Sequence, residues 1–286
     1  MDTTHPSRSS LTEEKAMKNK IALVLSVILM LLFAFGATGV AKADSLLDEV
    51  VKRKVVRVGV CLDAPPYSWK KSDGSFDGID IELANMLAAA LKVNVELQGI
   101  NTIARVPMLV SRKIDVVICG FTRTLERSLA VDFTDPYAVI GAVLLVNPSD
   151  PRSAEIKSYK DLKGKTVGGT MGGTSWIALQ RVAPEANMIS YKTIADAHQA
   201  LVTQKVVAMP TDSVMGYDQQ RMEPRHFKVV GDFFSVEDIC IGVPKGDQIW
   251  LNWLNLFLHQ NQVEGKIAPL YEKWFKSPAP KFTGRY

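Results

Sequence analysis

Polar side chains that could bind an anion follow an apolar run near the middle of this 286-residue chain. Residues 116–118 are all β-branched and apolar, which is typical of a strand buried on both faces. Gly120 lets the backbone come close to another group, and Thr122 offers a hydroxyl and an N–H at the start of a predicted short helix. Arg127 follows one turn later with a planar fork that can hold a carboxylate. The spacing predicts a carboxylate-binding site, and these residues alone leave open a capped surface helix with a solvated arginine.

A parallel sheet is predicted to position this site. Apolar strand-like runs alternate with helical patterns in the first half of the chain, and the runs lie at 55–60, 93–97 and 114–118. Strands and helices in alternation are typical of a parallel sheet with helical crossovers.

After residue 138 the alternation of strands and helices starts again as a second α/β unit. The last strand and helices of the chain are then expected to rejoin the first sheet. The strands expected after that point lie at 139–146, 206–209, 227–230 and 239–243. We therefore expect an α/β fold with two Rossmann-like lobes, residues 44–140 with 237–286 and residues 141–236, joined by two hinge strands. This topology favours hinge closure over a ligand held in a cleft between the lobes.

The first 43 residues are predicted to be a signal peptide with an N-terminal extension. Three lysines precede an apolar run at 21–35, and Ala41-Lys42-Ala43 matches the small-x-small cleavage pattern. We expect cleavage between Ala43 and Asp44, and Met17 as the true start. An uncleaved anchor is the alternative, but the run is shorter than the roughly 20 apolar residues that a membrane span needs.

Composition and charge exclude some functions. The chain is 47% hydrophobic and 22% charged, with a formal net charge of +4 and no basic stripe, so we expect no nucleic-acid partner. The three cysteines are Cys61, Cys119 and Cys240, and their odd number leaves at least one thiol unpaired. A bridge between Cys61 and Cys119 can form if their strands are neighbours. No metal-ligand spacing is present, and no cofactor is expected.

Several motifs together resemble the periplasmic solute-binding proteins for amino acids, which feed ATP-driven importers. They are Gly-Ile-Asp-Ile-Glu-Leu at 78–83, the stretch 113–127, Phe-Thr-Asp-Pro-Tyr at 133–137 and the closing helix at 270–275. The resemblance extends from Asp44 to Phe275, and it implies the type II periplasmic binding protein fold.

The resemblance implies a site for a free amino acid. Arg127 matches the arginine that grips the α-carboxylate, and Thr122 and the backbone of Gly120 match groups that share the carboxylate and the amino group. Thr174 matches a second-lobe residue that donates its N–H to the carboxylate, and Asp212 matches the aspartate that holds the α-ammonium. A zwitterion needs a buried cation and a buried anion, because either charge buried unpaired costs several kcal/mol. Binding and closure should therefore be one event.

The resemblance also bears on the ligand side chain. Cys61 and Ala64 stand where many relatives carry a polar or acidic residue and an aromatic lid, and the missing acid argues against a cationic ligand. Arg105 is similar to an arginine that reaches the ligand side chain in relatives that bind aspartate or glutamate. Arg105 could instead be a surface arginine at the start of a helix. Arg123 is a second candidate for contact with the ligand side chain, and its alternative is a charge that faces solvent. The residues that could stack on the ligand, or simply pack, are Phe121, Trp69 and Trp176.

We expect a non-enzymatic, monomeric periplasmic protein that captures a polar L-amino acid and delivers it to an ABC permease and ATPase complex. An acidic amino acid such as glutamate or aspartate is one option for this ligand. A different class shares the fold, namely a periplasmic cyclohexadienyl dehydratase that acts on arogenate or prephenate. An enzyme needs a positioned proton donor in the cleft, and the sequence offers no candidate. A ligand sensor for a membrane receptor is the third alternative.

Overall fold

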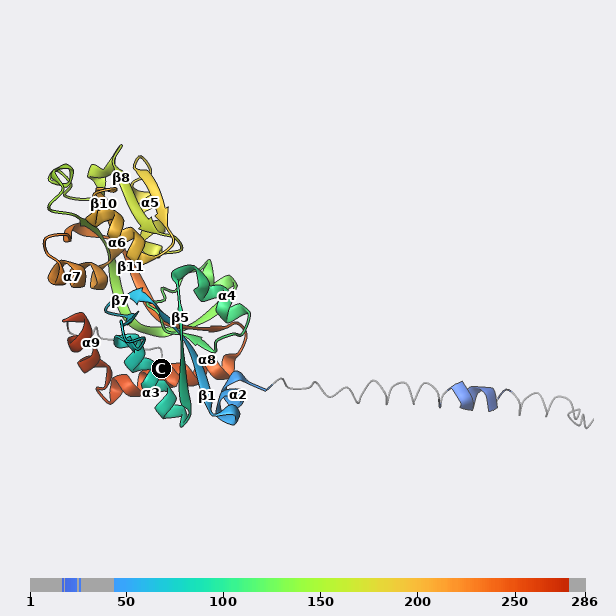
Figure 1. Cartoon of the computed structure of the whole chain (residues 1–286). Coiled ribbons are helices and arrows are strands. Elements are labelled where there is room, and N and C mark those ends of the chain that lie inside the picture. The colour runs from blue at the N-terminus through green and yellow to red at the C-terminus, as the bar shows by residue number, and fades with distance from the viewer. Residues whose placement is uncertain (1–16, 18, 25, 27–43, 278–286) are drawn as a thin grey trace, which may run out of the picture. The chain divides into compact units, whose positions relative to one another are not determined.

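The computed structural model describes residues 17, 19–24, 26 and 44–277, and the chain divides into two compact units, 1–43 and 44–286 (Figure 1). The described residues of the first unit are helical. The predicted cleavage site at 41–43 lies outside the described residues. No helix in the described ranges is long and apolar enough to cross a membrane. The sheets and the candidate site belong to the second unit.

One mixed sheet of eight strands forms the centre of the second unit. Its strands are β1 (Val55–Cys61), β5 (Asn94–Ile100), β6 (Val116–Val117), β7 (Val131–Val146), β8 (Thr166–Thr170), β9 (Asn187–Tyr191), β10 (Ala208–Asp212) and β11 (Lys228–Pro244). They lie in the order β5-β1-β6-β11-β7-β10-β8-β9. β1 pairs in parallel with β5 and β6, and β8 pairs in parallel with β9 and β10. The α/β fold with two lobes is confirmed, with one parallel part of the sheet in each lobe.

β7 and β11 are the two connections between the lobes, and they run antiparallel to each other. They contain 16 and 17 residues. The prediction of separate strands at 227–230 and 239–243 was wrong, as was the start of the strand expected at 139–146, because β7 begins at Val131. The ladder between β7 and β11 extends both strands through stretches whose own sequence is polar, with register shifts on the way. Both strands continue without a break through residues 140 and 237, so neither strand has an end that marks a boundary between the lobes. The division of the lobes at these residues therefore stays a prediction.

Helices cover both parts of the sheet. They are α2 (Leu46–Arg53), α3 (Ile79–Leu91), α4 (Arg105–Val110), α5 (Thr174–Val182), α6 (Ile194–Val202), α7 (Ser213–Met222), α8 (Gln248–Val263) and α9 (Ile267–Phe275). Figure 1 shows α2, α3, α4, α8 and α9 with β1 and β5, and α5, α6 and α7 with β8 and β10. A small second sheet follows β1 and contains β2 (Asp63–Ala64), β3 (Ser68–Lys70) and β4 (Phe76–Asp77).

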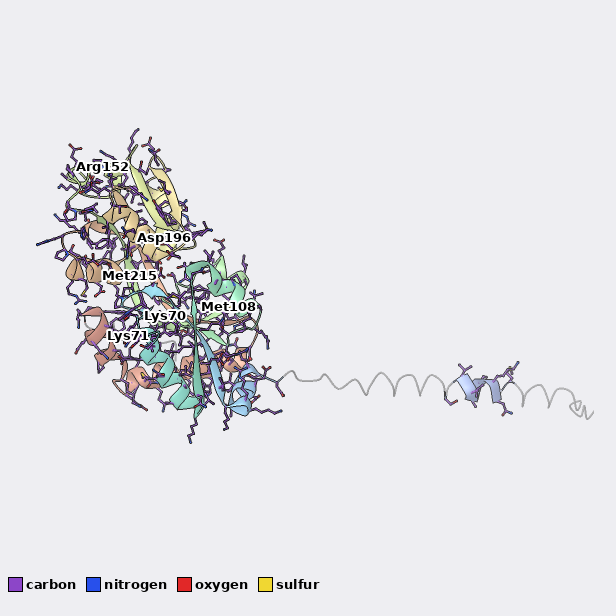
Figure 2. All side chains as sticks on the ribbon, in the orientation of Figure 1. Lys70, Lys71, Met108, Arg152, Asp196 and Met215 are labelled. Carbon is purple, nitrogen blue, oxygen red and sulfur yellow. A yellow bond between two sulfur atoms is a disulfide. The ribbon has the colours of Figure 1, made fainter. Side chains whose placement is uncertain are left out.

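Each lobe has its own hydrophobic core. In the first lobe, Val58 of β1 and Leu87 of α3 are fully buried in a cluster that also takes in α8 and α9. In the second lobe, two smaller clusters are centred on Leu144 and Leu145, which are consecutive residues of β7 and therefore point to opposite faces of the sheet. Met215 of α7 (Figure 2) packs with the first-lobe core, so this second-lobe helix contacts the other lobe.

A disulfide joins Cys61 and Cys119, with their Cα atoms 4.9 Å apart. Cys61 ends β1 and Cys119 follows β6, and these strands are paired neighbours. The condition stated for this bridge is therefore met. Cys240 is a free, buried thiol, and burial raises its pKa to about 12. The thiol therefore stays protonated at neutral pH and behaves as a small apolar side chain.

Candidate functional site

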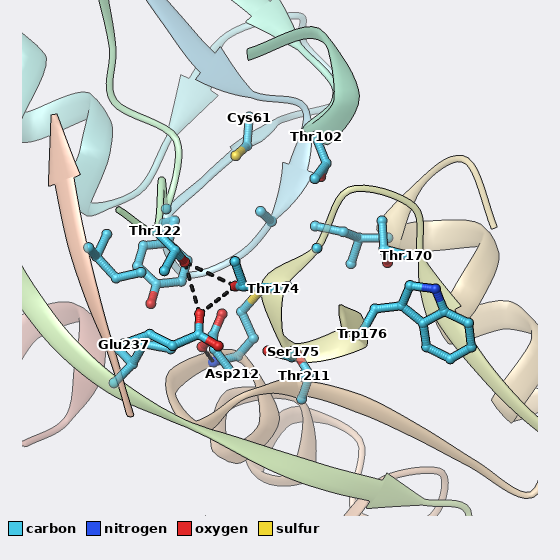
Figure 3. A pocket seen from close by; sticks show the side chains of 18 of the residues that line it. Cys61, Thr102, Thr122, Thr170, Thr174, Ser175, Trp176, Thr211, Asp212 and Glu237 are labelled. Carbon is cyan, nitrogen blue, oxygen red and sulfur yellow. Dashed lines mark hydrogen bonds between the residues drawn. The ribbon is translucent and has the colours of Figure 1, made fainter. Parts of the chain in front are cut away.

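A cavity of about 80 Å³ lies where loops from the two lobes meet (Figure 3). This volume is enough for a few water molecules. The cavity is lined from the first lobe by residues that follow β1 and β6, and from the second lobe by the start of α5 and the end of β10. The predicted site residues that line it are Arg105, Gly120, Thr122, Thr174 and Asp212. These five positions are far apart in the sequence, and the fold brings them to one place.

Gly120 is fixed by its backbone rather than by a side chain. Its φ is +50°, a conformation that favours glycine, and a Cβ there would lie 3.2 Å from the ring of Tyr67. Its N–H donates to Oδ2 of Asp80 at 2.9 Å, and the Tyr137 hydroxyl donates to Oδ1 at 2.7 Å. Asp80 is fully buried, and burial raises its pKa to about 7. The Gly-Ile-Asp motif thus holds the loop that carries Gly120 and Thr122.

Thr122 and Thr174 converge on one carboxylate. The Thr122 hydroxyl donates to Oε2 of Glu237 at 3.0 Å, and the Thr174 hydroxyl donates to the same oxygen. The two hydroxyl oxygens are 3.1 Å apart, and Figure 3 shows the triangle that they form with Glu237. The Ser235 hydroxyl donates to the other carboxylate oxygen at 3.0 Å. Thr122 belongs to the first lobe and Thr174 to the second, so this arrangement is a carboxylate-binding site assembled by both lobes.

Asp212 caps α7 and faces the cavity (Figure 3). Its Oδ1 accepts a hydrogen bond from the N–H of Met215 at 2.8 Å, so Asp212 is both the N-cap of α7 and part of the cavity wall. Burial raises the pKa of Asp212 to about 7, and the charge of Glu237 adds to the shift. No cation contributes to that shift. The carboxylate therefore lacks the counterion that a buried charge needs.

Arg105 is a buried guanidinium at the start of α4. Its Nε–H donates to the carbonyl of Thr102 at 3.0 Å, and its Nη1 donates to those of Cys119 and Gly120 at 3.2 and 3.3 Å. None of these acceptors is a carboxylate. Burial lowers its pKa well below the usual range, and the charge of Arg127 lowers it further. Arg105 thus brings a fixed positive charge to the cavity wall without an ion pair of its own.

Arg127 does not line this cavity. Its Nη1 donates to the carbonyl of Thr122 at 2.5 Å and its Nη2 to that of Gly172 at 2.8 Å, so it bridges the two lobes. Its guanidinium lines a groove on the outer side of Thr122 and Glu237. Burial lowers its pKa to about 10, and the charge of Glu237 opposes that shift. The predicted helix start at Thr122 was wrong, because Thr122 forms an isolated antiparallel bridge with Ile239 and the short 3-10 helix covers only Arg127–Leu129.

The aromatic candidates take different places. Phe121 does not line the cavity; the guanidinium carbons of Arg105 and Arg127 lie 4.8 and 5.0 Å from its ring centroid. It therefore supports the two arginines by cation–π contact. Trp69 packs against Trp274 with ring centroids 5.7 Å apart, outside the cavity. Trp176 belongs to the cavity lining, but its buried ring packs in the second-lobe core against Gly169.

Arg123, the second candidate for contact with the ligand side chain, lies at the surface. Its guanidinium is 2.6 Å from the carboxylate of Asp238, and both side chains are more than a third exposed. An exposed ion pair of this kind contributes little to stability. Arg123 is absent from the cavity lining.

Two residues of the cavity were not expected from the sequence. Glu237 was absent from the predicted site, although it is an acid at the point where a hinge strand was expected. Tyr67 lines the cavity with a buried hydroxyl that has no hydrogen-bond partner within the described part of the chain. Burial raises its pKa, and the charge of Asp212 adds to that shift. Its place at the end of a rigid Pro65-Pro66 loop was the signal that could have indicated it.

The family can now be stated. A model of the bacterial extracellular solute-binding proteins, family 3, matches residues 56–277. The chain belongs to this family. A glutamine-binding protein of Geobacillus stearothermophilus is 33% identical over 73% of this chain and 80% of its own length. A glutamate/aspartate import solute-binding protein of Salmonella typhimurium is 28% identical over 86% of this chain and 85% of its own length.

A solved structure agrees with this family 3 assignment. It is an ancestral amino acid-binding protein described as a precursor of cyclohexadienyl dehydratase. It has a TM-score of 0.75 and 37% identity, and the match covers 81% of this chain and 100% of that one. The curated relatives are named as binding proteins, in agreement with the prediction of a solute-binding protein. The resemblance inferred from the motifs is confirmed.

Proposed function

We propose that this protein captures a free polar L-amino acid between its lobes by hinge closure and delivers it to an ABC permease and ATPase complex. The observation that carries the proposal is the pair of hydroxyls, Thr122 from one lobe and Thr174 from the other, that converge on a single carboxylate oxygen. Such a site exists only when the lobes are together. A ligand carboxylate that binds there would hold them closed.

The charges around the cavity support a zwitterionic ligand. The α-ammonium would pair with Asp212, whose raised pKa reflects a buried carboxylate without a cation. The α-carboxylate would lie at Thr122 and Thr174, near the positive charges of Arg105 and Arg127. The two positive charges of these arginines equal in number the two negative charges of the Asp212 and Glu237 carboxylates. A net-neutral zwitterion keeps that balance, which is the electrostatic condition for burying charge at low cost.

The ligand side chain follows from the same balance. An acidic side chain would add a further negative charge beside the ligand's own α-carboxylate and Asp212, whereas a neutral polar side chain would not. We therefore favour a glutamine-like ligand. A glutamate- or aspartate-like ligand is the second candidate, and it is favoured by Arg105, a buried guanidinium whose hydrogen-bond acceptors are all backbone carbonyls. Relatives named for glutamine and for glutamate/aspartate both share this family.

The N-terminal sequence supports a proposal for the compartment in which the protein acts. A signal peptide cleaved after Ala43 would export the chain to the periplasm, where family 3 proteins meet their solutes. There the closed form would dock on the importer as a monomer. Docking on a membrane receptor is the alternative, and the ligand site would serve both roles equally.

The test is a thermal-shift screen of the chain from Asp44 onward against all twenty amino acids, followed by calorimetry. We expect a polar amino acid to raise the melting temperature in proportion to the logarithm of its concentration, since it binds the folded state alone. Thr174→Val removes one hydroxyl from the site and should lower the affinity, whereas Thr203→Val, at an exposed helix end, is the matched control. A screen in which no amino acid changes the melting temperature would refute the proposal.

A further inference from the structure

Glu237 is the only carboxylate in the described part of the chain that accepts hydrogen bonds from both lobes at the cavity wall. We propose that Glu237 is an internal competitor of the ligand: its carboxylate occupies the place of the α-carboxylate in the closed, ligand-free protein, and an incoming amino acid displaces it. This inference rests on the proposed function, because it assigns the carboxylate position of the same site.

The contacts of Glu237 are those of a bound carboxylate. One oxygen accepts from Thr122 and Thr174, and the other accepts from Ser235. Thr122 is only 6% exposed, so water cannot readily replace the carboxylate there. Hydrogen bonds to an ionised acceptor are about twice as strong as those between neutral groups. The contacts with Thr122 and Thr174 therefore hold the lobes together without a ligand.

A displaced Glu237 side chain has a place to go. Glu237 lines both the inner cavity and the outer groove, and it separates the two. The groove has a volume of about 500 Å³, and its lining includes Arg123, Arg127 and Arg181. A carboxylate that turns outward would thus move toward positive charge instead of into an apolar core. The exchange replaces one carboxylate by another at the two hydroxyls, while the ligand ammonium enters beside Asp212.

The proposal predicts whether removal of Glu237 raises or lowers the affinity for the ligand. Contacts that stabilise the ligand-free closed form lower the apparent affinity, because the ligand must break them before it can bind. Removal of Glu237 should therefore open the ligand-free protein and tighten binding. If Glu237 instead contacted the ligand directly, for example its ammonium, removal would weaken binding. The two roles predict opposite changes in the dissociation constant.

The experiment compares Glu237→Ala and Glu237→Gln with Asp238→Ala. Asp238 is the next residue on β11, and its removal takes away the same charge from an exposed position paired with Arg123. The first readout is small-angle scattering of the ligand-free proteins. We expect a larger radius of gyration for Glu237→Ala than for the wild type, and no change for Asp238→Ala. Equal radii for the wild type and Glu237→Ala would overturn the proposal.

The second readout is calorimetry with L-glutamine and L-glutamate as probes. We expect Glu237→Ala to bind the recognised probe at least about tenfold more tightly than the wild type, because the ligand no longer has to break the charge-assisted hydrogen bonds of Glu237. Glu237→Gln keeps the shape of the side chain, guards against a folding defect, and should show a smaller change of the same sign. Weaker binding by both variants would overturn the inference and leave the proposed function standing. If neither probe binds any of the proteins, the proposed function fails for these ligands, and the scattering still tests Glu237.

Discussion

The raised pKa of Asp212 makes a specific prediction about pH. With a pKa of about 7, roughly half of the Asp212 carboxyls are ionised at pH 7, and about 1% are ionised at pH 5. A ligand ammonium pairs with the ionised form only. The affinity is therefore present above the pKa and is lost as the pH falls through it. Between pH 7 and pH 5 the affinity should fall about 50-fold, which corresponds to about 2.3 kcal/mol.

Calorimetry at several pH values between 5 and 8 measures this effect. Titrations at pH 7 in two buffers with different ionisation enthalpies give a second measure, since the ligand ammonium lowers the pKa of Asp212 and drives its proton into the buffer. We expect a release of about half a proton per ligand bound at that pH. Asp212→Asn should bind weakly and release no proton.

Asp80 provides the matched control. Its pKa is also about 7 through burial, but its carboxylate contacts Gly120 and Tyr137 and does not line the cavity. Asp80→Asn should therefore keep most of the pH dependence of binding. An affinity that stays constant from pH 5 to pH 8, or an Asp212→Asn variant with the full pH dependence of the wild type, would refute the pairing of Asp212 with the ligand ammonium.

Three further substitutions test other parts of the site. Arg127→Ala should weaken amino-acid binding about tenfold in calorimetry while circular dichroism shows an intact fold, because the variant loses the bridge between Thr122 and Gly172 across the lobes; an unchanged dissociation constant would exclude this role. Arg105→Ala should weaken acidic ligands more than neutral ones, whereas an equal loss of L-glutamate and L-glutamine would exclude a role with the ligand side chain. Cys119→Ser should lower the free energy of unfolding by about 2–4 kcal/mol in urea, because the disulfide no longer restricts the unfolded chain; an unchanged midpoint would contradict this.

The parts of the fold that follow from local sequence were predictable. The run that ends at Ile118 is continuously apolar and fully buried, and the structure contains a strand there, β6, although it is only two residues long. The bounds of β7 and β11 were not predictable in this way. The polar start of β7 and the polar middle of β11 become strand because each strand pairs with the other along most of its length, and a sequence pattern does not contain that partner.

The same distinction holds within the site. The family motifs indicate which positions come together, and Thr122, Thr174 and Asp212 do meet at one cavity. They do not indicate where a long side chain points. Arg127 reaches the carbonyl of Gly172 in the other lobe, and Glu237 reaches the two hydroxyls. Both orientations depend on contacts across the interface between the lobes, which form only after each lobe has folded.

The pairing of β7 with β11 has a mechanical consequence. Two ribbons bonded side by side resist shear and splaying, and they bend or twist far more readily than they slide. The register of this pair shifts between Val230 and Ser235 and again near Cys240, so the compliance is concentrated in short stretches beside Glu237. Two lobes joined in this way would open and close along essentially one direction, between an open and a closed form. A membrane partner that probes its outline would read a yes-or-no signal of closure, not a graded one.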